Sequence, residues 1–270
     1  MKLRLLSILS FSVLVVSCTK NPITNRRQFK LLPEATLQSM AAGQYQQFLS
    51  ENKVVTSNTN RDAEMVRRVG QRITKAVTEY YTSIGREKDL EGYKWEYNLV
   101  DSKDVNAWCM PGGKIVVYTG LLPITQNEAA LAVVMGHEVS HALFSHGNER
   151  MSQGLVAMGI QEGLNIALQN KPQETRNLFL TAFGLGAQVG VLLPFSRKDE
   201  YESDHYGLWC AAMAGYNPQE AIPLWERMEK AGGGQKPPEF LSTHPSEGNR
   251  IEQLKKFMPE ALKYYKPVGK

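Results

Sequence analysis

The chain has 270 residues, of which 42% are hydrophobic and 21% are charged, as in an ordinary globular protein of one sizeable domain or two small ones. Its formal net charge is +4, and lysine and arginine are spread along the sequence instead of forming the basic clusters of nucleic-acid-binding proteins. A nucleic-acid partner is therefore excluded.

The first 17 residues are predicted to be a signal peptide. Lys2 and Arg4 precede a mostly apolar run at residues 5–16, which is too short to span a bilayer. Small residues then lead to Cys18, an arrangement that resembles the lipobox of bacterial lipoproteins. We therefore expect lipidation at Cys18, a tether over residues 18–33, and a location in the bacterial cell envelope, lipid-anchored at the outer membrane and facing the periplasm. An ordinary signal peptide with a chance cysteine is the alternative.

Two helices and two strands are predicted in the first half of the chain. The sequence favours a helix at residues 34–49, and apolar residues at helical spacing predict a second helix at residues 62–81. The period then changes to two at residues 95–99, which is typical of a half-buried strand. A turn at residues 111–113 is followed by a β-branched and aromatic segment at residues 114–119, which predicts a second strand.

A helix at residues 129–145 is predicted to be the centre of the protein. The preceding residues 125–128 have the form of a capping box, and Gly147 is a suitable residue at which the helix can stop. Apolar side chains surround this helix on all sides, as expected for a buried helix. It nevertheless carries two histidines and a glutamate in its middle.

The rest of the chain is predicted to be helical. The glycine-rich and apolar residues 151–195 are interpreted as two helices. Further helices are predicted at residues 198–214, from Pro218 onward, and at residues 246–257. Helices, a small sheet and helices again follow one another, so we expect an α+β fold with one domain over residues 34–270.

Residues 137–141, His-Glu-Val-Ser-His, form a metal-binding motif on the predicted central helix. His137 and His141 are one turn apart on the same helix face, so both imidazoles can reach one ion, and neutral imidazole suits zinc. Glu138 lies beside them and is placed to act as general base toward the attacking water. Buried polar groups without partners are costly, so a metal site is favoured over incidental core histidines.

The third ligand that a catalytic zinc needs is predicted to be Glu200, in the acidic segment 196–204. Asp204 lies one turn further on and faces the same way, so we expect it to hold the far ring nitrogen of a ligand histidine. A carboxylate on the helix surface is the alternative for Asp204. Glu202 lies on the opposite side of this helix and is expected to point away from the metal. The expected cofactor is one zinc ion per chain.

Three segments resemble the HtpX and CAAX prenyl protease family of gluzincin zinc metallopeptidases. They are His-Glu-Val-Ser-His at residues 137–141, Ser-Arg-Lys-Asp-Glu-Tyr-Glu-Ser-Asp at residues 196–204 and Thr-His-Pro-Ser-Glu-Gly-Asn-Arg-Ile at residues 243–251. The resemblance is closest to the envelope lipoprotein branch of the BepA, LoiP and YcaL type, although Ser203 stands where the family usually has alanine. It implies a mainly helical zincin-like domain that hydrolyses peptide bonds, in misfolded or unassembled proteins of the cell envelope.

Three further regions are expected to lie near the zinc. The resemblance places His244 there, where it can stabilise the oxyanion or occupy the open metal position in a resting form, with a plain structural role as the alternative. In zincins an edge strand precedes the metal helix and accepts the substrate peptide, so Asn106 and Trp108 are candidates, with ordinary core positions as the alternative. Residues 151–195 are expected to form a helical lid over or beside the cleft. The two remaining histidines are assigned structural roles.

Two other classes of protein fit parts of this sequence. A di-iron carboxylate bundle uses Glu-x-x-His motifs, which residues 138–141 and 202–205 match, but this hypothesis leaves His137 and the pair Glu200 and Asp204 without a role. Metal content distinguishes one zinc from two irons. A non-catalytic binding protein on a peptidase scaffold would keep the same residues, and only a hydrolysis assay separates it from an enzyme.

Two cysteines remain if Cys18 is acylated. An oxidising compartment would permit a disulfide between Cys109 and Cys210. We favour two separate buried thiols, because the sequence alone does not bring their Cα atoms within bonding distance.

Overall fold

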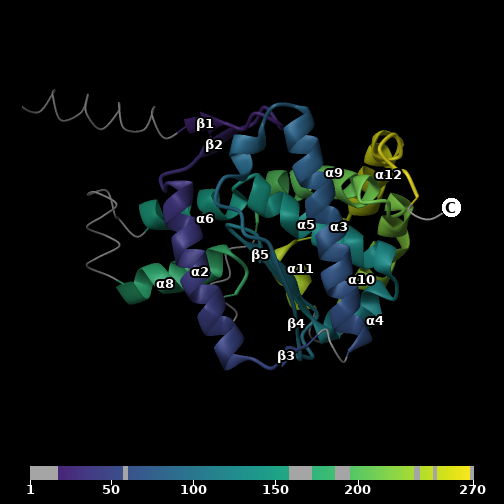
Figure 1. The fold of residues 1–270 in the computed structure, drawn as a ribbon, viewed down its shortest axis with the longest axis horizontal. Helices are drawn as coiled ribbons and strands as arrows, with labels where there is room; N and C mark the ends of the chain where they lie inside the picture. Colours follow the sequence, from purple (N-terminus) through teal and green to yellow (C-terminus); the bar gives the residue numbers. More distant parts are fainter. Residues whose placement is uncertain are drawn as a thin grey trace, which may run out of the picture.

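Helix α5 (Glu128–Leu143) runs through the middle of the fold, between the sheet and further helices (Figure 1). The computed structural model describes residues 18–56, 60–157, 172–185, 195–233, 238–245 and 248–267, so the predicted signal peptide at residues 1–17 lies outside the described residues. Within these ranges the chain is mainly helical and has a small mixed sheet, which confirms the α+β class.

The predicted helices at residues 34–49, 62–81 and 198–214 are present as α2, α3 and α9. The strands are β1 (Cys18–Lys20), β2 (Arg27–Phe29), β3 (Val54–Val55), β4 (Glu96–Val100), β5 (Ala107–Met110) and β6 (Lys114–Tyr118). The other α-helices are α2 (Glu34–Glu51), α3 (Arg61–Ser83), α4 (Leu122–Thr125), α6 (His146–Ala157), α8 (Pro172–Ala182), α9 (Arg197–Met213), α10 (Ala221–Gly232), α11 (Glu239–Thr243) and α12 (Arg250–Ala261). Short 3-10 helices lie at Glu87–Leu90, Thr119–Leu121 and Pro218–Glu220.

The main sheet has four strands in the spatial order β3-β4-β6-β5. Strands β4 and β6 run parallel, whereas β3 and β5 are antiparallel to their neighbours. Strand β5 therefore lies at the edge of the sheet, and it packs against α5. This places the strand that precedes the metal-binding motif beside the helix that carries the motif.

Both faces of this sheet are buried. Successive residues of a strand point to opposite sides, so each strand contributes side chains to two different cores. One core contains α3, α5 and α9, and the sheet contributes to it Leu99, Ala107, Cys109, Ile115 and Val117. The second core contains α2, α6 and α8, and the sheet contributes to it Val100, Trp108, Met110, Val116 and Tyr118. A register shift of one residue would exchange the two sets, so the burial of both faces fixes the register.

Glycine residues allow α5 and α9 to lie very close to each other. A Cβ atom at Gly207 would lie 2.8 Å from the backbone nitrogen of His137, and one at Gly136 would lie 2.6 Å from the carbonyl oxygen of Gly207. A larger side chain at either position would meet backbone atoms, which cannot rotate away. This contact sets the distance between the motif on α5 and the carboxylates on α9.

The ends of α5 differ from the prediction. Asn127, not Thr125, is the N-cap, and its side chain accepts a hydrogen bond from the backbone nitrogen of Ala130 at 2.9 Å. The helix ends at Leu143, before the predicted stop, because Ser145 adopts a left-handed conformation with φ of 55°. Gly147 lies in α6, where the ring of Phe183 occupies the space of its missing side chain.

The segment assigned to a tether contains secondary structure in this fold. Strands β1 and β2 form an antiparallel hairpin in which Cys18 pairs with Phe29. The chain that follows is attached to α6, since the Leu31 nitrogen donates to Ser152 Oγ at 2.9 Å and the Asn148 side chain donates to the Leu32 carbonyl at 2.8 Å. Residues 18–33 are thus part of the folded domain.

The buried cysteines are separate. Within the described part of the chain, Cys109 on β5 and Cys210 on α9 are both buried and neither forms a disulfide. This confirms the interpretation as two separate thiols.

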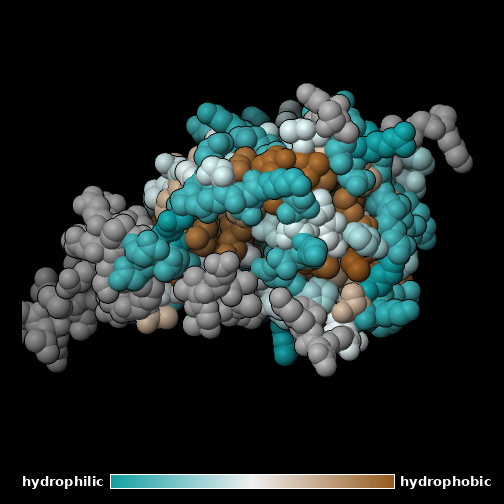
Figure 2. Space-filling view, turned by 90° about the horizontal axis from the view of Figure 1, so that it is seen from below, coloured by the Kyte–Doolittle hydropathy of each residue, from teal (hydrophilic) through white to brown (hydrophobic). Residues whose placement is uncertain are grey.

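In the view from below, hydrophobic side chains gather in the middle of the face between bands of hydrophilic side chains (Figure 2). Of the helices in the described residues, none has both the length and the apolar character needed to cross a membrane.

The tight contact between α5 and α9 predicts a difference between two glycine substitutions. Gly207→Ala should lower the free energy of unfolding by about 1–3 kcal/mol, because the added methyl group overpacks the contact. Gly43→Ala is the matched control on α2, where a Cβ atom meets nothing within 4 Å. It should be neutral or stabilise by up to about 1 kcal/mol, since alanine favours a helix over glycine. Urea unfolding measures both values, and a Gly207→Ala variant as stable as the control would contradict the proposed packing.

Candidate metal centre

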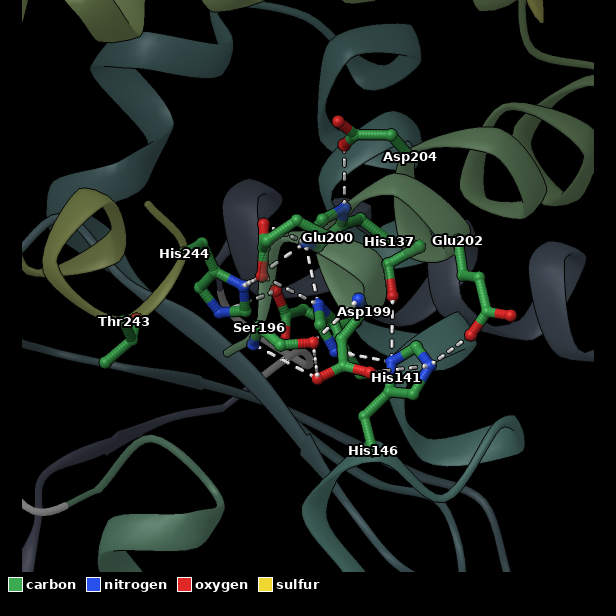
Figure 3. Close-up of polar contacts among 12 residues, drawn as sticks. His137, His141, His146, Ser196, Asp199, Glu200, Glu202, Asp204, Thr243 and His244 are labelled. Carbon is green, nitrogen blue, oxygen red and sulfur yellow. Dashed lines mark hydrogen bonds and ion pairs between the residues drawn. The ribbon is translucent and has the colours of Figure 1, made fainter. Parts of the chain in front are cut away.

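The motif residues of α5, two carboxylates of α9 and the residue after α11 meet in the interior of the domain (Figure 3). Helix α5 supplies His137, Glu138 and His141, and α9 supplies Glu200 and Asp204. His244 follows α11. All of these side chains are buried. The structure therefore brings together the residues that the sequence analysis assigned to one site.

Nitrogen and oxygen atoms of the motif converge at metal-binding distances. His137 Nε2 lies 3.0 Å from His141 Nε2. The Glu200 carboxylate reaches both rings, with Oε1 3.3 Å from His141 Nε2 and Oε2 3.5 Å from His137 Nε2. Two ligand atoms of a tetrahedral zinc with bonds near 2.0–2.1 Å are separated by about 3.3 Å. The three side chains are thus spaced as zinc ligands.

His244 adds a fourth nitrogen to the same group. Its Nδ1 lies 3.2 Å from His137 Nε2 and 3.0 Å from Glu200 Oε1. One ligand atom from each of the four side chains lies within 4.8 Å of the others. Four protein ligands are typical of closed structural zinc sites, whereas catalytic sites use three and keep a position open.

The protonation states of these buried groups suit the binding of a cation. Removal from water lowers the pKa values of His137 and His141 well below their ordinary range, so both rings are neutral at pH 7. Burial alone would raise the pKa of Glu200, but the nearby His244, the hydrogen bonds from His141 and His244, and the charge of Arg250 hold it well below its usual range. Neutral imidazoles with an ionised carboxylate are the donor set that zinc binds in proteins.

Glu138 is a buried carboxyl group with an unsatisfied oxygen. Its Oε1 has no hydrogen bond to any described residue, and the nearest ring nitrogen there, His244 Nε2, lies 3.5 Å away. Burial, together with the negative charge of Glu200, raises the pKa of Glu138 well above its ordinary value. A carboxyl group with a raised pKa beside a metal site is suited to accept and return a proton near neutral pH.

Asp204 lies behind His137. Its Oδ1 is 3.1 Å from His137 Nδ1, the ring nitrogen that faces away from the metal-binding group. Arg250 donates to the same oxygen at 2.6 Å and lies 3.1 Å from Glu200 Oε2. Burial raises the pKa of Asp204 to about 6 although Arg250 acts to lower it. His137 Nδ1 has no hydrogen bond within the described residues, so Asp204 contacts the ring as a close carboxyl neighbour that favours a hydrogen on Nδ1.

His146 contacts His141, the second histidine of the motif, although the sequence analysis gave it only a structural role. Its Nδ1 lies 2.9 Å from His141 Nδ1, and its Nε2 lies 3.0 Å from Glu202 Oε2 (Figure 3). Glu202 does point away from the metal-binding group, but it points toward His146 and not toward solvent. The spacing of residues along one helix does not show this contact, because His146 begins α6 after the left-handed turn at Ser145.

The edge strand lines the site with Ala107, Cys109 and Trp108, although the Trp108 side chain also belongs to the second core. That side chain is packed in the second core against Tyr45 and Phe48, and the Asn106 side chain binds the backbone nitrogen of Ala107. A cavity of about 10 Å³ lies between β5, Glu138 and His141. This volume is about that of one water molecule, so the site is closed to a peptide in this conformation.

Part of the expected lid can be placed. Phe183 and Gly184, which follow α8, line the cavity together with Phe195, whose ring lies 4.0 Å from that of His141. Residues 158–171 and 186–194, which make up much of the segment predicted as a lid, lie outside the described residues.

Comparison with known proteins identifies relatives of this chain. The sequence matches the family model described as Peptidase family M48 over residues 67–258. The mitochondrial metalloendopeptidase OMA1 of Schizosaccharomyces pombe is 34% identical over 242 residues, which are 89% of this chain and 66% of the relative. The human mitochondrial metalloendopeptidase OMA1 is 32% identical over 254 residues, 90% of this chain and 46% of the relative. The beta-barrel assembly-enhancing protease of Escherichia coli is 28% identical over 185 residues, 65% of this chain and 37% of the relative. The chain thus spans about half to two thirds of the OMA1 relatives.

These relatives contradict the expected location at a bacterial outer membrane. The more similar proteins are mitochondrial OMA1 proteins of a fungus, a plant and animals, and the bacterial protease is less similar. The prediction failed because the N-terminal segment on which it relied has a feature that different targeting sequences share. An apolar run with basic residues, in a segment whose first acidic residue is Glu34, shares its lack of acidic residues with mitochondrial targeting sequences. That location was inferred from the lipobox-like segment at Cys18 and from the resemblance to the envelope lipoprotein branch, and the comparisons support neither the branch nor the lipid anchor.

The lowered histidine pKa values predict how zinc binding responds to pH. Protons compete with a metal for imidazole, so affinity falls once the pH drops below the pKa of the ring. Because the pKa values of His137 and His141 lie well below 6.5, zinc affinity should be constant from about pH 8 to 6.5 and fall only under more acidic conditions. Competition with a chelator, corrected for protonation of the chelator, measures this. A loss of about tenfold or more between pH 8 and 6.5 would contradict the prediction.

Proposed function

Because this chain belongs to peptidase family M48, we propose that it is a zinc-dependent endopeptidase whose metal is held by His137, His141 and Glu200. The observation that carries the proposal is the convergence of two neutral imidazoles and one ionised carboxylate at 3.0–3.5 Å in the interior. The same group of side chains, placed beside the unsatisfied Glu138, supports a hydrolytic role over a purely structural metal site.

When bound, zinc supplies Lewis-acid chemistry that polarises a carbonyl group and makes water more acidic. Glu138 accepts the proton of the attacking water at its carboxylate and then donates that proton to the nitrogen of the leaving amine. Asp204 keeps His137 in the tautomer that presents Nε2 to the metal, from a distance of 3.1 Å at Nδ1. We assign to the backbone of β5, next to the cavity, the role of pairing with the substrate chain.

His244 occupies the fourth position of the metal site in this closed form. Its Nδ1 lies with the donor atoms of His137 and Glu200, which favours a resting ligand over a donor to the oxyanion. The α11 segment then acts as a strap, since the Phe195 nitrogen donates to the Thr243 carbonyl at 3.0 Å and the Phe195 ring covers His141. Release of this strap, with the predicted lid at residues 151–195, would open the site to a peptide.

We propose unfolded, misfolded or unassembled polypeptides as substrates. A site closed by a strap and buried beside an edge strand needs a substrate segment that can become extended. The name of the Escherichia coli relative, beta-barrel assembly-enhancing protease, supports a link to protein assembly. An origin of these substrates in the bacterial envelope is not carried over, because the location on which it depended is contradicted.

The central test of the reaction is a Glu138→Gln substitution. The amide keeps the shape of the side chain but cannot accept the proton, so hydrolysis of an unfolded polypeptide such as casein should fall by about 10²–10⁴-fold. Zinc content, measured by elemental analysis, should remain at about one ion per chain. If the glutamine variant keeps normal activity, or if the fully zinc-loaded parent cleaves no unfolded polypeptide, the mechanism is wrong.

The role of His244 is tested by His244→Ala. If the ring blocks the fourth position, its removal should increase hydrolysis of unfolded polypeptide, and the absorption spectrum of the cobalt-substituted protein should shift with the change in ligands. A loss of activity of about 10²-fold or more would instead assign His244 to stabilisation of the oxyanion. The neighbouring Pro245→Ala variant controls for disturbance of the loop.

A further inference from the structure

The Nδ1 atoms of the two motif histidines, which face away from the proposed metal, have different partners. Asp204 reaches His137 directly, whereas the far nitrogen of His141 meets a second imidazole, that of His146, at 2.9 Å. His146 is fully buried and continues to Glu202 Oε2 at 3.0 Å. A carboxylate therefore supports each proposed ligand, but for His141 it acts through an inserted ring.

The hydrogen atoms of this relay can be assigned from its geometry. To bind a metal through Nε2, His141 must carry its hydrogen on Nδ1 and donate it to His146 Nδ1. His146 must then carry its own hydrogen on Nε2, where Glu202 Oε2 accepts it at 3.0 Å. Ser203 Oγ lies 3.3 Å from His146 Nδ1 and can donate to the same nitrogen, which leaves this arrangement unchanged. The arrangement requires the Glu202 carboxylate to stay in place.

Arg26, from the N-terminal hairpin, holds that carboxylate. Its Nε donates to Glu202 Oε2 at 2.7 Å, and its two remaining nitrogens donate to Glu149 Oε2 at 2.7 Å and Asp199 Oδ1 at 3.0 Å. The Arg26 side chain is only 20% exposed. Because Asp199 also closes the capping box of α9 with Ser196, the guanidinium group joins the hairpin to the start of the helix that carries Glu200.

This cluster differs from an ordinary surface salt bridge, which contributes little. Three carboxylates converge on one guanidinium group, and their side chains are 4–11% exposed. Without the guanidinium, like charges would repel one another at short range, and Glu202, which also has a hydrogen bond with Thr24, would be pushed away from His146. His146, Asp199 and Glu202 also have the spacing of metal ligands, but Arg26 already supplies the positive charge there.

We propose that Arg26 is a positioning residue for the metal ligand His141, acting through Glu202 and His146, so that the N-terminal hairpin is a working part of the metal centre. This inference rests on the proposed function, because it takes His141 as a zinc ligand. Docking of the hairpin sets the orientation of the His141 ring. Loss of the Arg26 contacts therefore weakens zinc binding at a site whose three ligands are all unchanged.

The test compares zinc affinities by chelator competition in the full chain. Arg26→Ala and Glu202→Leu should each lower the affinity about 10–100-fold, as is usual when a group behind a metal ligand is lost. Leucine keeps the approximate size of the side chain and removes the oxygen that accepts the His146 hydrogen. Arg26→Lys, which keeps the charge but not the three-way fork, should lie between Arg26→Ala and the parent. Arg27→Ala is the matched control, because Arg27 is the next residue, carries the same charge and is exposed. It should change the affinity by less than about twofold.

A double variant separates positioning from general destabilisation. If Arg26 acts through Glu202, combining Arg26→Ala with Glu202→Leu should cost no more than about threefold beyond the larger single loss. Full multiplication of the two losses, or an Arg26→Ala variant that keeps parental affinity, would overturn the inference. Should Arg26→Ala fail to fold by circular dichroism, parental zinc affinity in Glu202→Leu would overturn it equally. A parent protein that binds no zinc would instead refute the proposed function.

Discussion

The relative positions of the imidazoles on α5 and the carboxylates on α9 depend on the contact between these two helices. Gly136 and Gly207 remove the side chains that would separate these helices, and the virtual Cβ positions at 2.6 and 2.8 Å from backbone atoms show that little separation is possible. The helices carry complementary halves of the site: imidazoles on α5 and carboxylates on α9. A metal site with distances of 3.0–3.5 Å between its donors requires such close and rigid support.

The same closeness places several polar groups in a low-dielectric interior. Burial lowers the pKa values of the histidines and raises that of Glu138, whereas Glu200 stays ionised among positive and hydrogen-bonding partners. Arg250 joins Glu200 and Asp204 and stacks at 3.5 Å on the ring of Trp225, which holds it in place. The two carboxyl groups therefore differ in their chemistry: Glu200 is ionised and can bind a cation, whereas Glu138 can accept a proton.

Local sequence patterns predicted the parts of the site that lie along single elements. The spacing of His137 and His141 on an apolar helix, and of Glu200 and Asp204 on the next metal-binding helix, follows from helix geometry alone. The period-two alternation at residues 95–99 likewise predicted β4, and the β-branched and aromatic residues 114–119 predicted β6. These features needed no knowledge of how distant segments meet.

Contacts between distant segments were not predictable in the same way. Ser145 takes a left-handed conformation that ends α5 early and turns His146 back toward His141, and no helical spacing shows this. Residues 18–33 have no apolar period, and their structure comes from tertiary contacts such as that of Arg26 with Glu149. Trp108 lies on the strand next to the site, but the alternation of the sheet directs its side chain into the other core.

Anomalous diffraction from crystals of the zinc-loaded protein, recorded on both sides of the zinc absorption edge, tests this account most directly. The account predicts one strong peak per chain among His137 Nε2, His141 Nε2 and the Glu200 carboxylate. A peak at the neighbouring group of His146, Asp199 and Glu202, or a protein ligand set at the main site that omits Glu200, would contradict it.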